Sequence, residues 1–321
     1  MNFLYCFDQN YNKQAGVSIS SLAKNVSEEI DIFIIHDNPN SFLEIKKMLE
    51  KYKYIKNINV YEFKDFKYDF PNLKGKHVSY ATYFRMFIEN YLPKNLDYVI
   101  YIDADVVCLN NPLNELEKTI TKMKKGKFYI SGVSEGTKEV SKEYFNNLGY
   151  QGEKYFNAGV VVIDFQKWTS SQMVNSLTQI MAEKYQKIVY WDQDILNVYF
   201  NGNYYNLNKI LNYKLDLNSY DPQKFEFVKQ NVIFLHYSGN GKPWSFDSVL
   251  KENSKFYQDA FFNFYNKTFH SEINLKKHEI LSLFKLFTLQ KQLKNKYPLK
   301  LFLINLIQFV KKLFYYVKNE K

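Results

Sequence analysis

The chain has 321 residues, of which 46% are hydrophobic, and it carries a formal net charge of +10 at pH 7. The apolar content excludes a disordered protein, and this length can bury one large core or two modest ones. The two cysteines, Cys6 and Cys108, form no disulfide framework and lie in apolar, strand-like surroundings. We therefore expect buried, reduced thiols and a reducing, cytoplasmic compartment.

The positive charge is unevenly distributed along the chain. Residues 271–321 contain eleven lysines and three glutamates, which leaves +8 there and only about +2 for the first 270 residues. A nucleic-acid-binding surface more often spreads lysine and arginine over the folded body, so we expect no nucleic-acid partner. The N-terminus enters a strand pattern directly, without a charged region before it, so no signal peptide is expected.

Strand patterns alternate with helical patterns over the first sixty residues. This βαβαβ order predicts a parallel sheet with right-handed crossovers. No Gly-x-Gly-x-x-Gly fingerprint of a dinucleotide-binding fold is present. Strands are expected at 3–7, 30–35, 58–63, 97–102, 127–133, 155–164 and 232–235, and helices from about 15 to 22, at 42–52, at 77–87 and from 191 onward.

A pair of aspartates follows the most apolar of these strands. The run from Asp97 to Ile102 predicts a strand buried on both faces, and Asp103 and Asp105 come directly after it. Their spacing places both carboxylates on one side of an extended chain. Because paired carboxylates at a buried strand end are costly unless neutralised, a site for Mg²⁺ or Mn²⁺ that also holds a diphosphate is favoured over a solvated turn.

Other strand ends carry polar residues as well. Asp8, Asn10 and Tyr11 follow the first strand, where they could bind a base and ribose or serve only as helix caps. His236 ends the last strand and is a possible metal ligand. The glycine-rich loop after it contains Lys242, which could meet a phosphate.

Two further stretches each admit more than one interpretation. Arg85 lies beside an apolar helix face and could bind a phosphate, pair with an aspartate, or be a surface residue. Asp192 and Gln193 open a helix, where they could cap it or face sugar hydroxyls. Small residues after Asn157 would allow another group to approach the backbone closely.

In this order, the motifs resemble those of the family 8 retaining glycosyltransferases, which include lipo-oligosaccharide galactosyltransferases and glycogenin. The resemblance covers roughly residues 2 to 250, and any single motif is weak whereas six in order are strong. The motifs are Asp8-Gln9-Asn10-Tyr11, Arg85 in its helix, Asp103-Ala104-Asp105, Phe156-Asn157-Ala158-Gly159, Asp192-Gln193-Asp194, and His236 to Trp244 with Lys242-Pro243-Trp244.

The resemblance implies an α/β protein of the GT-A type, with a mixed, Rossmann-like sheet flanked by helices. It implies a UDP-sugar donor and Mn²⁺ or Mg²⁺ held by Asp103, Asp105 and His236. Glu135 stands where the family often has aspartate, which leaves the donor sugar open. The implied substrate-binding residues are Asp8, Asn10, Tyr11, Arg85, Asp103, Ala104, Glu135, Asn157, Ala158, Asp192, Gln193, Gly239 and Lys242, with Gln193, Asp192 and Lys242 in catalysis.

The implied reaction is transfer of galactose or glucose to a cell-surface glycan or glycolipid acceptor, as in lipopolysaccharide biosynthesis. Because Gln193 is a poor nucleophile, we expect front-face attack, with the leaving UDP helping to deprotonate the acceptor. Two alternatives stay open: a self-glucosylating enzyme like glycogenin, and a catalytically silent module that docks on membranes. The oligomeric state is not readable from the sequence.

The C-terminal segment has a different character from the rest. We expect a GT-A domain over residues 1–270 and a basic, amphipathic helical tail over 271–321 whose last helix begins near Pro298. Lysines and amides interrupt its apolar residues, which argues against a membrane span and favours a helix lying on an anionic membrane surface, on the inner face of the cytoplasmic membrane. The alternative is a helix packed on the body or on a partner subunit.

Overall fold

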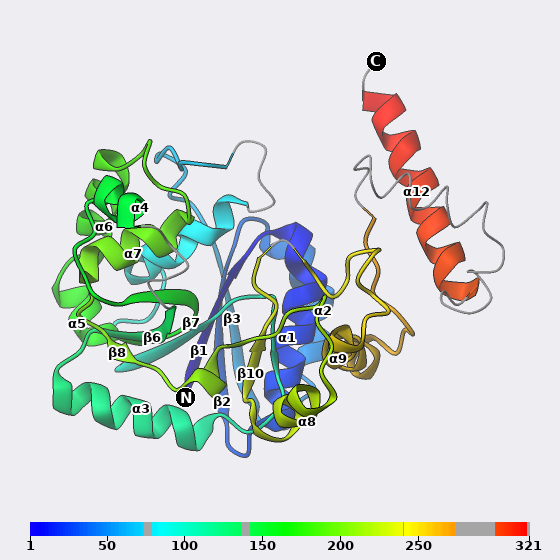
Figure 1. Cartoon of the computed structure of the whole chain (residues 1–321), viewed down its shortest axis with the longest axis horizontal. Helices are drawn as coiled ribbons and strands as arrows, with labels where there is room; N and C mark the ends of the chain where they lie inside the picture. The colour runs from blue at the N-terminus through cyan, green and yellow to red at the C-terminus, as the bar shows by residue number, and fades with distance from the viewer. Residues whose placement is uncertain (74–78, 136–141, 240, 274–298, 320–321) are drawn as a thin grey trace. The chain divides into compact units, whose positions relative to one another are not determined.

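The computed structural model describes residues 1–73, 79–135, 142–239, 241–273 and 299–319 (Figure 1). The chain divides into two compact units. The first contains residues 1–214 and 228–236, and the second contains residues 215–227 and 237–321. The domain boundary expected at residue 270 stays a prediction.

The first unit is built on a mixed seven-stranded sheet with the order β3-β2-β1-β4-β7-β6-β8. One half is parallel: β1 pairs with β2, β2 with β3, and β1 with β4. The predicted βαβαβ arrangement is thereby confirmed. These strands are β1 (Asn2–Phe7), β2 (Ile30–His36), β3 (Ile55–Glu62) and β4 (Tyr98–Ile102), and α1 (Asn12–Asn25), η2 (Pro39–Phe42) and α2 (Leu43–Leu49) connect the first three.

The other half of the sheet turns antiparallel at β7 (Tyr155–Asp164), which lies between β4 and β6 (Ile130–Glu135). All ten residues of β7 are buried, as are all five of β4, so this central pair lies wholly within the core. β8 (Tyr205–Asn206) closes the edge beside β6. A smaller sheet has the order β5-β10-β9, formed by β5 (Val106–Cys108), β10 (Phe234–His236) and β9 (Tyr213–Lys214).

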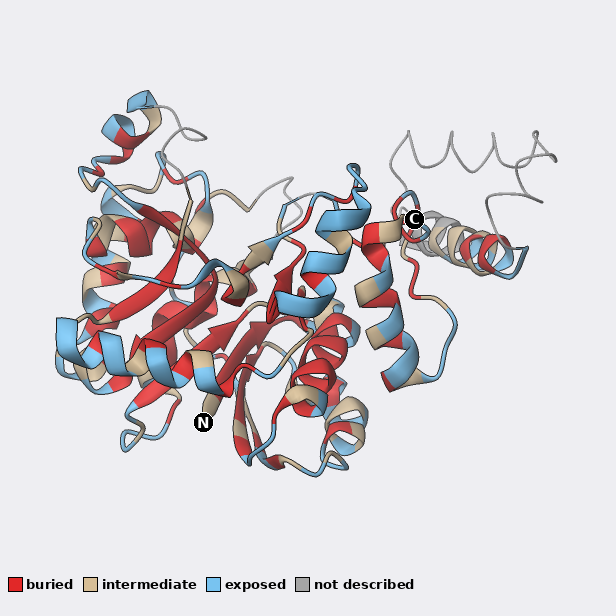
Figure 2. Cartoon of the chain, turned by 60° about the horizontal axis from the view of Figure 1, so that its bottom comes forward, coloured by how far each residue is buried: buried red, intermediate tan, exposed pale blue. Residues whose placement is uncertain are grey.

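Helices cover the sheet with their apolar sides inward, and Figure 2 shows the buried strands at the centre of this unit. The helix expected at 77–87 is an eleven-residue 3₁₀ helix, η3 (Tyr80–Asn90), whose start is capped by the Ser79 hydroxyl. The others are η1 (Gln9–Tyr11), α3 (Leu113–Gly126), α4 (Lys142–Leu148), α5 (Phe165–Ser170), α6 (Met173–Glu183), α7 (Trp191–Phe200) and η4 (Lys209–Leu211), and α8 (Pro222–Asn231) crosses the division between the units.

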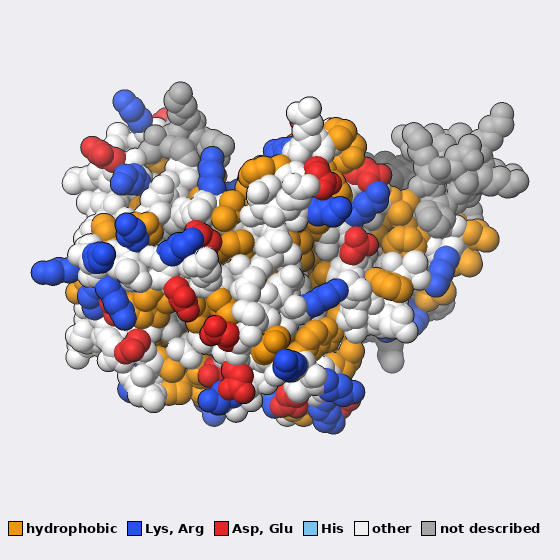
Figure 3. Space-filling model, turned by 90° about the horizontal axis from the view of Figure 1, so that it is seen from below, with side chains coloured by type: hydrophobic (Ala, Val, Ile, Leu, Met, Phe, Trp, Pro, Cys, Tyr) orange, Lys and Arg blue, Asp and Glu red, His pale blue; other side chains and the backbone are white. Residues whose placement is uncertain are grey.

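The prediction that both cysteines are buried and reduced is consistent with the structure, in which Cys6 and Cys108 are buried free thiols. On the face drawn in Figure 3, basic and acidic side chains are interspersed rather than gathered by sign.

The second unit contains η5 (Glu252–Ser254), α9 (Lys255–Tyr265) and α12 (Leu299–Asn319). One face of α12 is packed: Leu301 and Asn305 are fully buried, and Phe302 joins Phe246 and Ile273 in a small core. The amides of Asn305 and Gln308 both engage Ser271. Within the described residues, no helix is both long and apolar enough to cross a membrane.

Candidate active site

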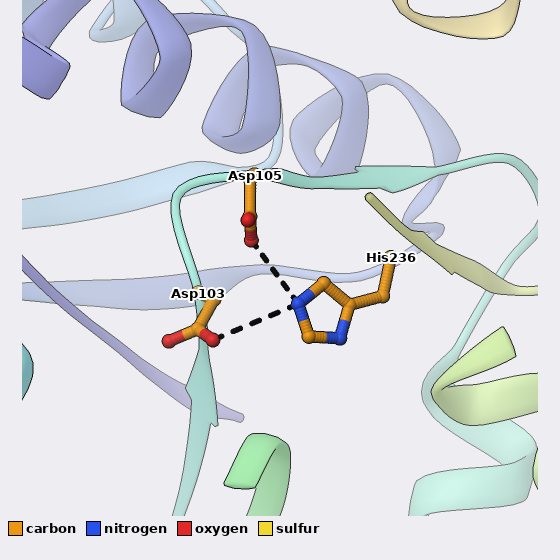
Figure 4. Close-up of side chains that lie close together, drawn as sticks. All are labelled: Asp103, Asp105 and His236. Carbon is orange, nitrogen blue, oxygen red and sulfur yellow. Dashed lines mark ion pairs between the residues drawn. The ribbon is translucent and has the colours of Figure 1, made fainter. Parts of the chain in front are cut away.

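Three side chains from separate strand ends converge in the first unit. Asp103 and Asp105 lie in the turn between β4 and β5, and His236 ends β10, where it pairs with Val106 of β5. The Nε2 atom of His236 lies 3.3 Å from Oδ1 of Asp105 and 3.7 Å from Oδ2 of Asp103. Figure 4 shows the three side chains pointing toward one another, and one potential ligand atom from each lies within 4.8 Å of the others.

This donor set fits a divalent cation. Two carboxylates and one imidazole are ligands that Mn²⁺ accepts, and carboxylates also suit Mg²⁺. Burial raises the pKa of Asp103 and the neighbouring Asp105 raises it further, while Arg85 and His236 oppose the shift. A bound cation would remove the repulsion between the two carboxylates. The sequence prediction that these three residues could share one metal is supported by their geometry.

Gly159 of β7 makes room for the histidine. A Cβ atom at this position would lie 2.1 Å from Cε1 and 2.6 Å from Nδ1 of His236, and 3.0 Å from Oδ2 of Asp103. The carbonyl oxygen of Gly159 also accepts a hydrogen bond from the backbone N–H of Asp103 at 2.8 Å. The sequence predicted that another group would approach the backbone closely at the Asn157-Ala158-Gly159 motif. In the structure, that group is formed by the side chains of His236 and Asp103.

Arg85, the only arginine of the chain, is buried beneath these carboxylates. Its guanidinium lies over the ring of Tyr101, pairs with Asp192, and places Nη1 3.6 Å from Oδ1 of Asp103. Nη1 also donates to the carbonyl oxygen of Ala158. Of the three interpretations of Arg85 left open by the sequence, pairing with an aspartate describes the structure, and a surface position does not.

Asp192, in the first turn of α7, is only 1% exposed. Its Oδ1 accepts hydrogen bonds from the Thr82 hydroxyl at 2.8 Å and from Nη2 of Arg85 at 3.2 Å, and its Oδ2 pairs with Nε of Arg85. Burial raises the pKa of this carboxyl, and Arg85 and Thr82 partly offset the shift. Asp192 therefore joins α7 to η3 through a buried ion pair.

The next residue, Gln193, is held against β7. Its Oε1 accepts hydrogen bonds from the backbone N–H of Ala158 at 3.1 Å and from Nδ2 of Asn157 at 3.0 Å. Its Nε2 donates to the hydroxyl of Tyr155 at 3.2 Å, and Tyr155 donates in turn to buried Asp194 at 2.6 Å. The two motifs that contain Asn157 and Gln193 thus form one connected network.

The loop after β1 forms a separate polar cluster. Asp8 is buried and caps η1 by accepting the backbone N–H of Asn10 at 2.9 Å, whereas Asn10 is exposed and Tyr11 is half-buried. Asp37, which follows β2, accepts the backbone N–H of Gln9 at 3.1 Å and the hydroxyl of Tyr80 at 2.9 Å. Asp8 is a cap, as one of its two interpretations had it, and a nucleoside-binding role for this loop stays a prediction.

Ala104 and Glu135, which the resemblance implied as substrate-binding residues, also lie in the first unit. Ala104, between the two aspartates, is buried in the turn. Glu135, which ends β6, forms an ion pair with Lys214 of β9. Burial lowers the pKa of Lys214.

Gly239 and Lys242 belong to the second unit. Gly239 has a φ of 86°, which favours glycine, and the ammonium of Lys242 donates to the carbonyl oxygen of Tyr237 at 2.8 Å. The next two residues accept hydrogen bonds from other segments of the second unit. The Pro243 carbonyl accepts from the side chain of Gln258 at 2.8 Å, and the Trp244 carbonyl accepts the Glu272 N–H at 2.7 Å. The loop therefore rests on α9 and on segment 270–273.

Sequence reasoning missed several residues of this site. Tyr101 lies two positions before Asp103, on the same side of the strand, and its hydroxyl donates to Oδ1 of Asp103 at 2.6 Å. That period-two spacing was a usable signal. Asn212, which contacts His236, lies in a distant loop and carried no such signal.

Comparison with known proteins identifies the class of protein to which the chain belongs. The model of glycosyl transferase family 8 matches residues 2–248. The chain is 30% identical over 255 residues to a lipopolysaccharide 1,2-glucosyltransferase of Escherichia coli K12, covering 76% of this chain and 72% of that protein. It is 29% identical over 263 residues to a lipopolysaccharide 1,3-galactosyltransferase of Salmonella typhimurium LT2, again covering 76% and 72%.

A solved structure has the same fold. The galactosyltransferase LgtC, determined with donor and acceptor sugar analogs, superimposes with a TM-score of 0.68 at 22% identity, covering 82% of this chain and 96% of LgtC. The mixed sheet with its flanking helices is thus the GT-A-like arrangement that the sequence predicted. The chain belongs to glycosyl transferase family 8 and is a glycosyltransferase.

Proposed function

We propose that this chain is a retaining hexosyltransferase that moves galactose or glucose from a UDP-sugar to a glycan or glycolipid acceptor, with the help of a divalent metal. The observation that carries this proposal is the convergence of Asp103, Asp105 and His236 in a family 8 chain. Relatives named for glucosyl and galactosyl transfer to lipopolysaccharide support a hexose donor and a surface-glycan acceptor.

In this proposal Asp103, Asp105 and His236 hold Mn²⁺ or Mg²⁺, which would neutralise charge on the diphosphate. Arg85 acts from within the protein, since its buried charge balances Asp192 and lies 3.6 Å from Asp103. Its positive charge opposes the rise in pKa that burial causes at the carboxyls of Asp103 and Asp192.

The proposed mechanism is front-face attack, with the diphosphate taking the acceptor proton. A covalent route needs a carboxylate within reach of the anomeric carbon. Both oxygens of Asp192 are engaged by Arg85, and Oε1 of Gln193 already accepts two hydrogen bonds. Neither side chain presents a free nucleophilic oxygen, which supports attack by the acceptor hydroxyl itself.

We assign Lys242 to the leaving diphosphate. It lies in a loop that contains Gly239 and Gly241, and the segment is braced by Gln258 and Glu272. A lysine ammonium is a compact positive charge on a flexible side chain, so it can stabilise the negative charge that develops on the leaving group.

The acceptor side of the proposal involves α12. Its packed face leaves the opposite face exposed, and large apolar side chains line that face at helical spacing: Leu299, Leu303, Ile307 and Val310. Exposed Lys300 and Lys311 flank them. An apolar stripe with lysines beside it suits the surface of an anionic membrane, so we propose that α12 holds the enzyme next to a lipid-linked acceptor.

A donor screen tests the function. The full chain is incubated with UDP-galactose, UDP-glucose and UDP-N-acetylglucosamine, with and without Mn²⁺, and released UDP and glycosylated lipopolysaccharide are measured. We expect Mn²⁺-dependent turnover of one hexose donor and transfer to the glycan. Growth in the intact mass of the protein with donor alone would instead indicate self-glycosylation, and turnover of no sugar nucleotide would contradict the proposal.

A further inference from the structure

Two buried asparagines connect the histidine of the proposed metal site to β7. Asn212 follows η4 and is 3% exposed, and Asn157 of β7 is 8% exposed. Their side chains contact each other, and the far side of Asn212 contacts Nδ1 of His236 at 2.8 Å. Each contact in this series joins a hydrogen-bond donor to an acceptor, so the direction of every hydrogen bond can be assigned.

The assignment of hydrogen-bond directions starts at a backbone amide. The N–H of Gly159 lies 3.0 Å from Asn157, and because an N–H can only donate, the side-chain atom that it meets is the oxygen Oδ1. The nitrogen Nδ2 of Asn157 therefore points the other way, toward Gln193 at 3.0 Å. The N–H of Ala158 independently requires an oxygen at that position of Gln193. Two backbone amides thus agree on one orientation.

The same logic continues to the histidine. Asn212 contacts Oδ1 of Asn157 at 2.8 Å, and since this oxygen only accepts, Asn212 contributes its nitrogen Nδ2. The oxygen Oδ1 of Asn212 must then face His236, so the ring nitrogen that it meets, Nδ1, carries a hydrogen. In a neutral imidazole the other nitrogen, Nε2, is then an unprotonated acceptor. That nitrogen faces Asp103 and Asp105.

We propose that Asn157 and Asn212 are positioning residues that fix the tautomer of His236, leaving the lone pair of Nε2 for the metal. This inference rests on the proposed function, because it assigns the relay to the proposed metal site. Metal-binding histidines generally depend on a partner at the second ring nitrogen, which fixes ring orientation and tautomer. Here the side-chain amide of Asn212 is the partner of the second ring nitrogen. The hydrogen bonds that begin at the backbone of β7 fix the orientation of this amide.

His36 provides a contrast within the same molecule. It is also buried and also contacts an asparagine oxygen, Oδ1 of Asn12, at 2.7 Å, but through Nε2. Its Nδ1 accepts the backbone N–H of Asn38 at 2.8 Å. His36 is therefore held in the opposite tautomer, so the two histidines should give opposite signatures in one experiment.

The test is ¹⁵N NMR of the full, metal-free chain labelled at histidine, at pH 8, with signals assigned by their loss in His236→Gln and His36→Gln. We expect a protonated Nδ1 and an unprotonated Nε2 for His236, and the reverse for His36. A wild-type His236 with a hydrogen on Nε2 at pH 8, either as the other tautomer or as an imidazolium, overturns the relay. This measurement needs neither metal nor substrate.

Calorimetric titration with Mn²⁺ alone supplies the second readout. Asn212→Leu removes the acceptor and should weaken Mn²⁺ binding about 10- to 100-fold. Asn212→Asp keeps an oxygen for Nδ1 and should stay within about threefold of wild type. Asn12→Leu is the matched control, since it removes the same kind of contact from His36, and it should leave Mn²⁺ affinity unchanged.

The outcomes separate the relay from the proposed function. Wild-type affinity in Asn212→Leu overturns the relay even if the enzyme is Mn²⁺-dependent. A wild-type chain with the expected tautomer but no Mn²⁺ affinity contradicts the proposed function and the ligand role of His236. If Asn212→Leu fails to fold, the wild-type tautomer still decides.

Discussion

The guanidinium of Arg85 lies 4.1 Å from the centre of the Tyr101 ring, and both side chains reach Asp103. The ring is a cation–π partner for the arginine, and its hydroxyl bonds the carboxylate that the arginine also approaches. Tyr101 therefore fixes the position of a buried positive charge against the proposed metal site. The role of this charge can be tested by removing it.

Arg85→Met should destabilise the protein by about 3–5 kcal/mol, because it leaves the buried carboxylate of Asp192 without its charged partner. Urea unfolding, followed by circular dichroism, measures this change. The double variant Arg85→Met with Asp192→Leu is the control and should lose much less than the sum of the two single changes. Additive losses would show that the pair is not the source of the effect.

Gly159→Ala should displace His236 and lower Mn²⁺ affinity by at least tenfold, since the added methyl group would overlap Cε1 of the ring. Gly241→Ala adds the same group where the nearest atom, Cδ1 of Leu217, is 3.8 Å away, and it should bind Mn²⁺ as wild type does. Calorimetric titration compares the two variants. Equal affinity in both would refute the close approach of His236 to β7.

Lys242→Ala should lower kcat more than it raises the KM for the donor, because negative charge on the leaving diphosphate peaks in the transition state. Steady-state kinetics over a range of donor concentrations separates the two constants. Lys251→Ala, which removes a lysine that bonds Asn218, is the matched control. A pure KM effect with kcat unchanged would show that Lys242 binds only the ground state.

The double change Leu303→Glu with Ile307→Glu should abolish binding to anionic vesicles without unfolding the chain, because both side chains are exposed. Substitution is a cleaner test than truncation, since Phe302 and Asn305 of the same helix are packed inside the second unit. Phe262→Glu replaces a comparably exposed residue of α9 and is the control.

Co-sedimentation at low and high salt measures this binding. We expect wild type and Phe262→Glu to bind at low salt and to lose part of that binding at high salt, where charges are screened. A full-length chain that ignores anionic vesicles would leave α12 with a packing role alone.

Local patterns were sufficient for the longer strands, whereas β5, β8 and β9, which have two or three residues each, were not predicted. The apolar runs of β1 and β4 predicted buried strands, as found. The two aspartates were expected on one side of an extended chain, but they lie in a turn in which the N–H of Val106 donates to the carbonyl oxygen of Asp103 at 3.2 Å. Strand ends differed by a few residues, as with β3, which begins at Ile55 rather than Ile58.

Long-range contacts are where local patterns fail. Nothing around Arg85 distinguished a surface side chain from a buried one, because its partners Asp192 and Ala158 are 107 and 73 residues away. Asn212 is a single polar residue in a loop, and only the fold brings it to His236 and Asn157. The three proposed metal ligands were brought together by family resemblance, since Asp103 and His236 lie far apart in the chain.

The most direct test of the central claim is UDP release from the preferred UDP-hexose, measured on one preparation of the full chain in excess EDTA and again after Mn²⁺ is restored. The account predicts no turnover in EDTA, full recovery with Mn²⁺, and a rate about 10²–10³ lower for Asp105→Asn with Mn²⁺ present. Undiminished turnover in EDTA, or in Asp105→Asn, would contradict it.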